Sequence, residues 1–140
     1  MGHVFFDHTG DVAVSLEAET AAGLFREAAR ALTEILTDFA QVRAAVPHPV
    51  QLTAASLDEL MIEWLSELLY RFEVQKVLVA EAEVELAESA EGWTLEAVVH
   101  GDSFDPLRHH IKVLVKGITY HRLNIVRDAR AWKTDVVFDI

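Results

Sequence analysis

Carboxylates stand at both ends of this 140-residue chain. Asp11 lies near the start, and Asp139 comes directly before the last residue, Ile140, so a side-chain carboxylate and the α-carboxylate occupy adjacent residues. If the fold brings Asp11 beside them, three carboxylates crowd one place, which is unfavourable unless a cation binds there or a pKa rises. Oxygen donors of this kind suit hard cations. The two ends therefore predict a divalent metal site for Ca²⁺, Mg²⁺ or Mn²⁺.

A lysine and two histidines lie in the same stretches of sequence. Lys116 sits between the apolar residues 113–115 and Gly117, and a lysine in such a run either extends to the surface or serves as a buried counter-charge. Beside a carboxylate cluster Lys116 could contact phosphate, and Gly117 leaves room for a ligand or backbone to approach. His8 and His121 are expected to support the carboxylates through hydrogen bonds rather than to bind the metal directly.

The acidic residues also have simpler explanations. Asp11 follows Gly10, and Asp with Gly beside a strand is common turn chemistry. Asp139 and Ile140 could be the frayed end of an edge strand. The alternation of Phe138 and Ile140 to the last residue favours a packed chain end, with Asp139 on the opposite face.

Two further histidines, His109 and His110, are adjacent in the sequence. On a strand they would point to opposite faces of the sheet. In a loop both could reach one metal, but nothing in the sequence fixes that arrangement. We expect them to be surface or loop residues rather than ligands.

Composition excludes several classes of protein. The chain has 51% hydrophobic and 25% charged residues, which is typical of a globular protein, and its length predicts one domain over residues 1–140. It has no cysteine, hence neither disulfides nor a thiolate metal site. No apolar run approaches the ~20 residues that cross a bilayer, and the start lacks a signal sequence. We therefore expect a cytoplasmic protein with no membrane contact.

The net charge of −11 is the strongest bulk property. An acidic surface repels phosphate backbones, so any role near RNA is expected to be indirect, through a partner protein. The competing explanation is that the charge only keeps the protein soluble.

Hydrophobic periodicity predicts an α+β fold with two amphipathic helices packed on an antiparallel or mixed sheet. Thr20 is the expected N-cap of the first helix, and Ser56 with Glu59 forms a capping box for the second. We expect a turn at 46–49 and a bulge or bend where the alternation changes parity, near 119–121. The predicted order is two strands, a helix, a strand, a helix and four strands. The helices span about 21–38 and 57–72, and after a first strand in the apolar start near 4–6 the strands span about 11–18, 50–54, 77–88, 93–99, 113–118 and 132–140.

Three stretches together resemble the archease family. They are His8-Thr9-Gly10-Asp11, Lys116-Gly117-Ile118-Thr119-Tyr120-His121 and the terminal Asp139-Ile140. Each motif alone is weak, but all three in order, at both ends of the chain, are specific. The family usually has alanine where this chain has Gly10 and Gly117, which is a small-for-small difference.

The resemblance implies a function as an accessory protein, not an enzyme. Archeases activate the RNA-splicing ligase RtcB, accelerating its guanylylation and turnover in tRNA splicing and RNA repair. By position, Asp11, Asp139 and the carboxylate of Ile140 would hold the divalent cation, and Lys116 would be essential for activation. GTP would be bound by the ligase rather than by this chain.

Two other functions stay open from the residues alone. The first is a stand-alone metal-dependent phosphoesterase that uses Asp11 and Asp139, although only His8 and His121 could then serve as its base. The second is a chaperone-like binding module in which the carboxylates are structural.

Overall fold

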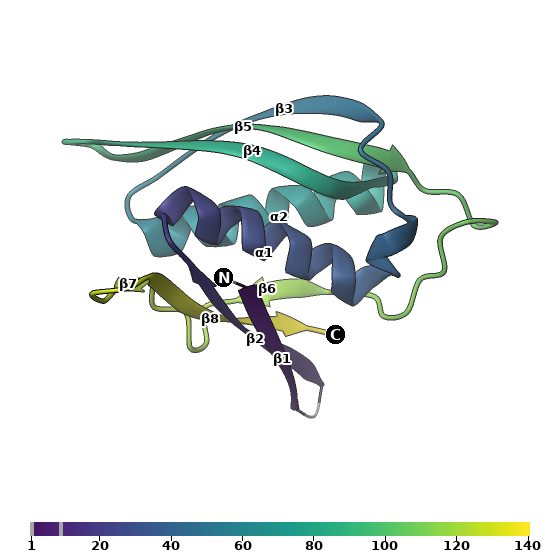
Figure 1. Cartoon of the computed structure of the whole chain (residues 1–140), viewed down its shortest axis with the longest axis horizontal. Helices are drawn as coiled ribbons and strands as arrows, with labels where there is room; N and C mark the ends of the chain where they lie inside the picture. The colour runs from purple at the N-terminus through teal and green to yellow at the C-terminus, as the bar shows by residue number, and fades with distance from the viewer. Residues whose placement is uncertain (1, 9) are drawn as a thin grey trace.

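Two helices lie side by side between two antiparallel sheets (Figure 1). The computed structural model describes the backbone of residues 2–8 and 10–140 and the side chains of 2–5 and 10–140. This arrangement confirms the α+β class, with two separate sheets where the sequence predicted one. The helices are α1 (Ala21–Leu36) and α2 (Leu57–Gln75), with a short 3₁₀ turn at Phe39–Gln41.

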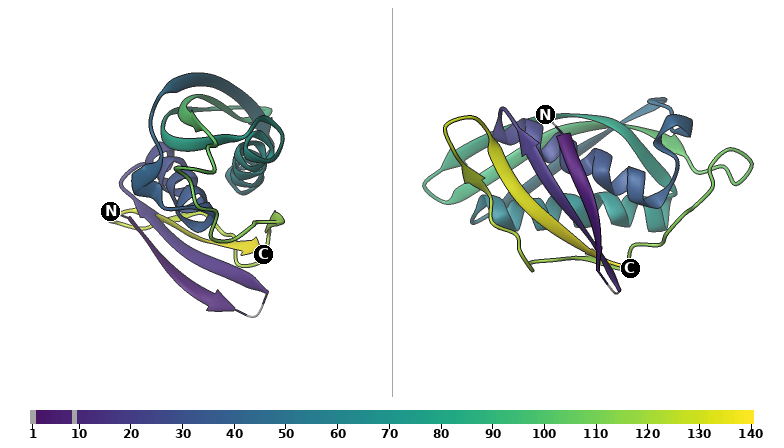
Figure 2. Two further views of the ribbon diagram at one scale, coloured as in Figure 1. Left: turned by 90° about the vertical axis from the view of Figure 1, so that its right-hand side faces the viewer. Right: turned by 60° about the horizontal axis from the view of Figure 1, so that its bottom comes forward.

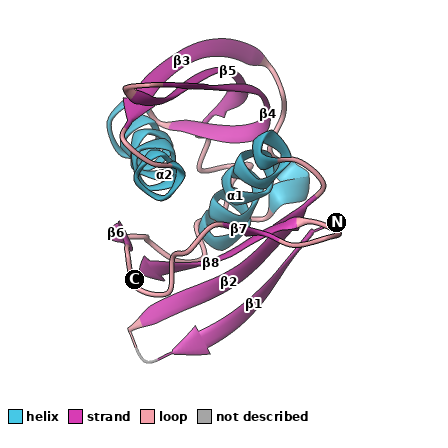
Figure 3. Cartoon of the chain, turned by 90° about the vertical axis from the view of Figure 1, so that its left-hand side faces the viewer, coloured by secondary structure: helices cyan, strands magenta, loops and turns pink. Residues whose placement is uncertain are grey.

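The two sheets are built from different parts of the chain. The first joins the two chain ends in the order β1-β2-β8-β6, with β7 also paired to β8, whereas the second is a three-stranded sheet in the order β3-β5-β4. Figure 3 shows them as two layers with the helices between. The strands are β1 (Gly2–His8), β2 (Asp11–Ala18), β3 (Val46–Ala54), β4 (Val77–Ser89), β5 (Gly92–Ser103), β6 (Gly117–Thr119), β7 (Val126–Arg127) and β8 (Trp132–Asp139).

The alternation of β2 and β8 sets which side chains face the helices. Val12 and Val14 on β2, with Val136 and Phe138 on β8, are buried in the core under the helices, as predicted. Because side chains alternate along a strand, Asp11 and Asp139 belong to the opposite face. The core pattern therefore fixes the direction in which both carboxylates point.

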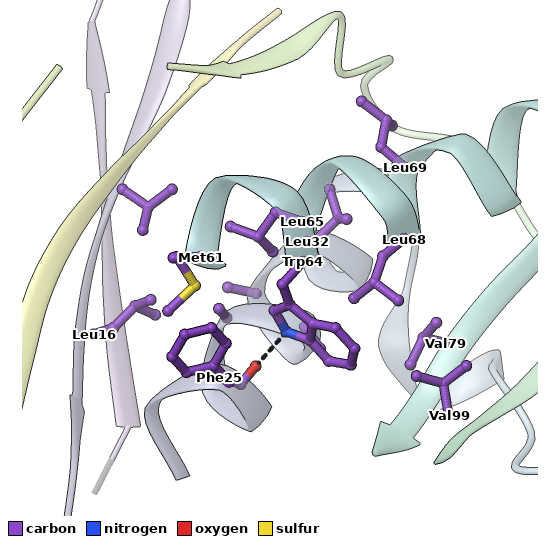
Figure 4. Packing of buried hydrophobic residues seen from close by; sticks show 14 of the residues in the cluster. Leu16, Phe25, Leu32, Met61, Trp64, Leu65, Leu68, Leu69, Val79 and Val99 are labelled. Atoms are coloured by element: carbon purple, nitrogen blue, oxygen red, sulfur yellow. Dashed lines mark hydrogen bonds between the residues drawn. The ribbon is translucent and has the colours of Figure 1, made fainter. Parts of the chain in front are cut away.

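The centre of the core joins the two helices. The buried Trp64 of α2 donates its Nε1–H to the carbonyl oxygen of Phe25 in α1 at 2.9 Å (Figure 4). Both side chains are fully buried, so this hydrogen bond satisfies the indole in an otherwise apolar region. It fixes the axial position of one helix against the other.

Helix caps agree with the sequence except in detail. Thr20 Oγ1 accepts from Gly23 N at 2.9 Å, and Ser56 Oγ accepts from Glu59 N at 3.1 Å. The Glu59 carboxylate returns to the Ala55 amide at 3.2 Å, and not to the Ser56 amide as predicted. The first helix ends at Leu36 instead of about residue 38.

Two predictions of secondary structure are wrong. Residues 46–49 were expected to form a turn but belong to β3. β3 is an edge strand, so only one of its two edges pairs with another strand. Pro47 and Pro49 lie two residues apart, so both missing N–H groups fall on the same, unpaired edge, where no donor is needed. Of the expected strand 113–118, only the part in β6 is regular. The parity change near 119–121 is a turn, closed by a hydrogen bond from Leu123 N to Tyr120 O at 3.1 Å.

In the described part of the chain, neither helix is long and apolar enough to cross a membrane.

Candidate functional site

The register of β2 and β8 places the two aspartates opposite each other. Asp11 pairs with Asp139 in this antiparallel ladder, and such neighbours have Cα atoms about 4.5–5.5 Å apart with side chains on the same face. Two like charges directly opposite each other destabilise a sheet. The predicted meeting of the two chain ends is therefore present in the fold.

Backbone hydrogen bonds join all three stretches at this end of the sheet. Ile140 N donates to Gly10 O at 3.2 Å, and Lys116 N donates to Asp139 O at 2.7 Å. Gly117, in β6, pairs with Asp139 from the other side. The right-hand view of Figure 2 shows the C-terminus beside the adjoining ends of β1 and β2. The chain end is thus held by hydrogen bonds rather than frayed.

The environments of the two carboxylates differ. Asp139 is exposed, whereas Asp11 is partly buried and its Oδ1 atom is buried without a hydrogen-bond partner among the described residues. A buried carboxylate oxygen without a donor costs about 1–3 kcal/mol or more. The site therefore contains an unsatisfied hard-oxygen donor on its inner side and an exposed one on its outer side.

This donor set fits a hard cation only when the terminal carboxylate is included. Among the described side chains, those of residues 2–5 and 10–140, no group of three His, Cys, Asp or Glu is arranged to hold a metal ion. The two aspartates lie in one ladder pair, and the tie between Ile140 N and Gly10 O brings the chain end to the same corner. The set is made of oxygen alone, which suits Ca²⁺, Mg²⁺ or Mn²⁺.

The structure places the predicted lysine and the two predicted histidines differently relative to the aspartates. Lys116 is exposed and directly precedes β6, so it is not a buried counter-charge. The backbone of His8 pairs with Asp11, but its side chain lies outside the described residues, as does Thr9. His121 is exposed, and its N–H donates to Thr119 Oγ1 at 3.2 Å. No described contact joins its imidazole to either aspartate, so its supporting role stays a prediction.

A cavity on the same sheet lies away from the aspartates. It has a volume of about 650 Å³, and Ser15, Glu17, Lys133 and Asp135 are among its lining residues. Glu17 pairs with Lys133 six residues along β2 from Asp11, a distance of about 20 Å at the usual rise of a strand. The carboxylate pair is therefore an exposed corner of the sheet, not part of this cavity.

Sequence reasoning missed a buried polar network between the second sheet and its following loop. Asp102 is 6% exposed, and its Oδ2 atom accepts from Arg108 Nη2 at 2.7 Å and from Arg43 N at 3.0 Å. His109 Nε2 lies 3.1 Å from the same oxygen and 3.0 Å from Gln41 O. Burial raises the pKa of Asp102, but the hydrogen bonds from Arg108 and from the Arg43 amide outweigh it and hold that pKa below its ordinary value.

His109 lies in a loop, which is one of the two expected positions, but it is buried in that loop rather than exposed at the surface. It is 2% exposed, and its Nδ1 atom accepts from Asp105 N at 2.9 Å. Both ring nitrogens are thus used within the fold, and the histidine binds the loop to the 3₁₀ turn through Gln41. Its place directly after Arg108, in a loop that also holds Asp105, was the only signal in the sequence.

Comparisons with known proteins agree with this geometry. The model of the Archease protein family (MTH1598/TM1083) matches residues 3–140. "Protein archease" of Methanosarcina mazei is 34% identical over 137 residues, 97% of this chain and 94% of the relative, and that of Methanopyrus kandleri is 33% identical, with 96% of each covered.

Solved structures have the same fold. The solution structure of Methanobacterium thermoautotrophicum protein 1598 superposes with a TM-score of 0.85 at 27% identity, covering 99% of each chain. The crystal structure of an archease described as a possible chaperone, from Thermotoga maritima, has a TM-score of 0.60 at 18% identity and covers 96% of this chain and 94% of that one.

Proposed function

The chain belongs to the archease family, and on that premise we propose that it is an accessory protein that activates the RNA-splicing ligase RtcB. In this role it accelerates guanylylation of the ligase and its turnover in tRNA splicing and RNA repair. The chain is an activator and not an enzyme by itself. The reaction belongs to the ligase, which binds the GTP, and the two proteins meet in the cytoplasm.

The observation that carries the proposal is the meeting of all three family-like stretches at one corner of the first sheet. Asp11 and Asp139 pair across β2 and β8, and backbone bonds tie the Gly10 and Lys116 segments to the chain end. Hydrophobic packing alone does not require two like charges in one ladder pair, because such a pair weakens the sheet. The cost is explained if the pair serves a ligand.

The ligand we propose is a divalent cation held by Asp11, Asp139 and the α-carboxylate of Ile140. The unpartnered Oδ1 of Asp11 supports this assignment, since a cation would satisfy it. A bound cation supplies positive charge that can polarise a phosphate oxygen. His8 and His121 are proposed as supporting residues at the rim of this corner.

Lys116 is the proposed essential cation of the chain itself. Its backbone is fixed to Asp139, while its side chain is exposed and free to reach outward. An ammonium group there can offset negative charge on a phosphate in the partner's nucleotide site. Charge placed in this way is usually worth a few kcal/mol.

The test is guanylylation of a purified RtcB ligase with and without this protein. We expect Asp11→Ala, Asp139→Ala and Lys116→Ala each to lower the activation by about 100-fold or more. Glu17→Ala is the matched control, because Glu17 lies on the same strand and the same face as Asp11 but at its far end. Normal activation by all three variants would overturn the site.

Metal binding has a readout that does not depend on the ligase. Calorimetric titration of the isolated chain with Ca²⁺, Mg²⁺ or Mn²⁺ should show a single site that Asp11→Ala and Asp139→Ala remove and Glu17→Ala keeps. A heat signal unchanged in both aspartate variants would contradict the proposed ligand set.

The two alternative functions predict different results. A phosphoesterase would hydrolyse a phosphate ester with Mg²⁺ or Mn²⁺ in the absence of the ligase, and Asp11→Ala would abolish that turnover. A chaperone-like module would suppress aggregation of an unrelated protein, with Lys116→Ala as active as the wild type. We expect neither result.

A further inference from the structure

The basic residues of this acidic chain are strongly segregated. Residues 106–127 contain no Asp or Glu, yet they hold five of the 12 Lys and Arg residues. The remainder of the chain carries all 23 acidic residues against the other seven basic ones, a net charge of −16 there. The basic residues of the segment are Arg108, Lys112, Lys116, Arg122 and Arg127.

Part of this segment is an extended strip that the fold fixes at both ends. Lys112 N donates to Leu36 O at 2.8 Å, and Lys116 N donates to Asp139 O at 2.7 Å. At the start of the strip, Thr37 Oγ1 donates to His110 O at 2.8 Å. We call residues 112–116 the lysine strip. In Figure 1 the chain runs along it from the protruding loop after β5 back to β6.

Exposure alternates along the lysine strip. Val115 is 4% exposed and belongs to the core, whereas Lys112, Leu114 and Lys116 face solvent. Lys116 lies four positions after Lys112, about 13 Å along an extended chain at the usual rise. The strip therefore displays two ammonium groups in one direction from a fixed backbone.

Some of the protein's cations are held in ion pairs with carboxylates, and in the part of the chain that the structure describes these two lysines are not among them. Lys133 pairs with Asp128 at 2.9 Å and Arg108 with Asp102 at 2.7 Å. Within the described residues, neither Lys112 nor Lys116 lies within ion-pair distance of a carboxylate. Their charges are therefore available to an external anion.

We propose that the lysine strip binds the phosphate backbone at the end of a single-stranded RNA. The inference rests on the proposed function and goes beyond it, because it adds a direct contact with RNA where the net charge of the whole chain predicts only an indirect one. The spacing of the lysines matches about four nucleotides of a stacked strand, and ammonium groups are compact charges that suit phosphate. Tyr120, 59% exposed just beyond the strip, offers a ring on which a base can stack.

The carboxylate pair favours phosphate over an acidic protein surface as the partner. The strip ends at Lys116, whose N–H is bonded to Asp139 O, and Asp139 pairs on its other side with Asp11, whose Oδ1 has no hydrogen-bond partner among the described residues. A second set of carboxylates approaching this corner would be repelled, whereas phosphate oxygens share a divalent cation readily. The charge of −16 on the rest of the chain repels a long polyanion, so only a strand end should bind, weakly and with strong salt dependence.

The test is a ¹⁵N NMR titration of the whole chain with a ten-nucleotide oligouridylate, in Mg²⁺, at low and at physiological salt. We expect shifts confined to residues 107–122 and to the two chain ends. Lys112→Ala should weaken binding about three- to ten-fold and reduce the salt slope by about 0.7, the contribution of one phosphate on a single strand. Arg43→Ala, an exposed cation away from the strip, is the control and should leave both unchanged.

Each other outcome counts against the proposal. Absence of shifts in the strip, or a Lys112→Ala variant that binds like the wild type, would overturn it. So would polyglutamate of equal length competing as well as RNA, since that would assign the strip to an acidic protein, or a response to inorganic pyrophosphate alone. Failure here is distinct from failure of the proposed function, because loss of activation in Asp11→Ala does not require RNA binding by Lys112.

Discussion

Asp11 and Asp102 are two carboxylates that the fold treats in opposite ways. Asp102 is buried near the end of β5 and accepts from Arg108 and from the Arg43 amide, with His109 at 3.1 Å. Asp11 lies at a corner of the first sheet, opposite another aspartate, and one of its oxygens is buried with no partner in the described part of the chain. Asp102 is buried and Asp11 is partly buried, and among the described residues Asp102 has cationic and amide partners, whereas none is found for Asp11 Oδ1.

The difference is what we expect if Asp102 is a structural carboxylate and Asp11 is the ligand-binding carboxylate proposed above. When one partner of a buried ion pair is removed, the other partner stays buried without a compensating charge, and this strongly lowers the free energy of unfolding. A carboxylate that is opposed by a like charge gains nothing from the fold. Hence removing Asp102 should damage the protein, whereas removing the charge of Asp11 should damage only what binds there.

The largest effect is expected for Asp102→Ala. The change leaves the Arg43 amide and the Arg108 guanidinium without their acceptor, which should lower the free energy of unfolding by about 3–5 kcal/mol. Urea unfolding followed by tryptophan fluorescence measures it, and Asp105→Ala, whose carboxylate lies farther from Arg108 at 3.6 Å, is the milder control. A loss below about 1 kcal/mol would remove the contrast between the two aspartates.

Most helices and strands could be predicted from the sequence, because the spacing of hydrophobic residues determines local secondary structure. The alternation in β2 and β8 and the caps at Thr20 and Ser56 all matched the structure. What failed was context: Pro47 and Pro49 mimic a turn, and only the position of β3 at a sheet edge makes them tolerable in a strand. Likewise, the separation into two sheets depends on which strands pair, and periodicity does not encode pairing.

Part of the candidate site could likewise be predicted from the sequence, and part could not. The meeting of Asp11 with Asp139 could be predicted from the family-like stretches, and the register agrees with it. The network of Asp102 and His109 could not, because its members become neighbours only after the loop closes on Gln41. The exposure of Lys116 could not be predicted, because residues 112–116 have no regular secondary structure. Their alternation of polar and apolar side chains had predicted a strand there.

A smaller effect should come from His3, which ties the hairpin carrying Asp11 to α1. His3 Nδ1 lies 2.9 Å from Glu27 and Nε2 lies 2.6 Å from Glu34. Unlike His109, whose Nδ1 accepts an amide proton, His3 must carry both protons to satisfy two carboxylates. Burial lowers the pKa of His3, but the hydrogen bonds and charges of Glu34 and Glu27 outweigh it and raise that pKa above 6.5.

Stability should therefore depend on pH through His3. A raised folded-state pKa contributes stability that is complete below the unfolded value of 6.5 and is lost as pH rises through the folded value. His3→Gln should cost about 1.5 kcal/mol at pH 6 and less at pH 9, measured by urea unfolding at both. His100→Gln is the matched control, since its partner Glu83 is 75% exposed. Equal losses at both pH values would contradict the charged bridge.

The smallest change in stability, and the most specific one, is expected for Asp11→Asn. Without divalent metal, the amide relieves repulsion from Asp139 but keeps the shape of the side chain, so the free energy of unfolding should change by less than about 0.5 kcal/mol. In excess Ca²⁺ the wild type should gain stability in proportion to the logarithm of the metal concentration, because only the folded state binds. The variant should gain none, whereas Glu17→Gln, at the far end of the same strand, should gain as much as the wild type. Thermal unfolding at several Ca²⁺ concentrations measures all three. If Asp11→Asn instead unfolds as easily as Asp102→Ala, then Asp11 is a structural carboxylate and the two regions do not differ in kind.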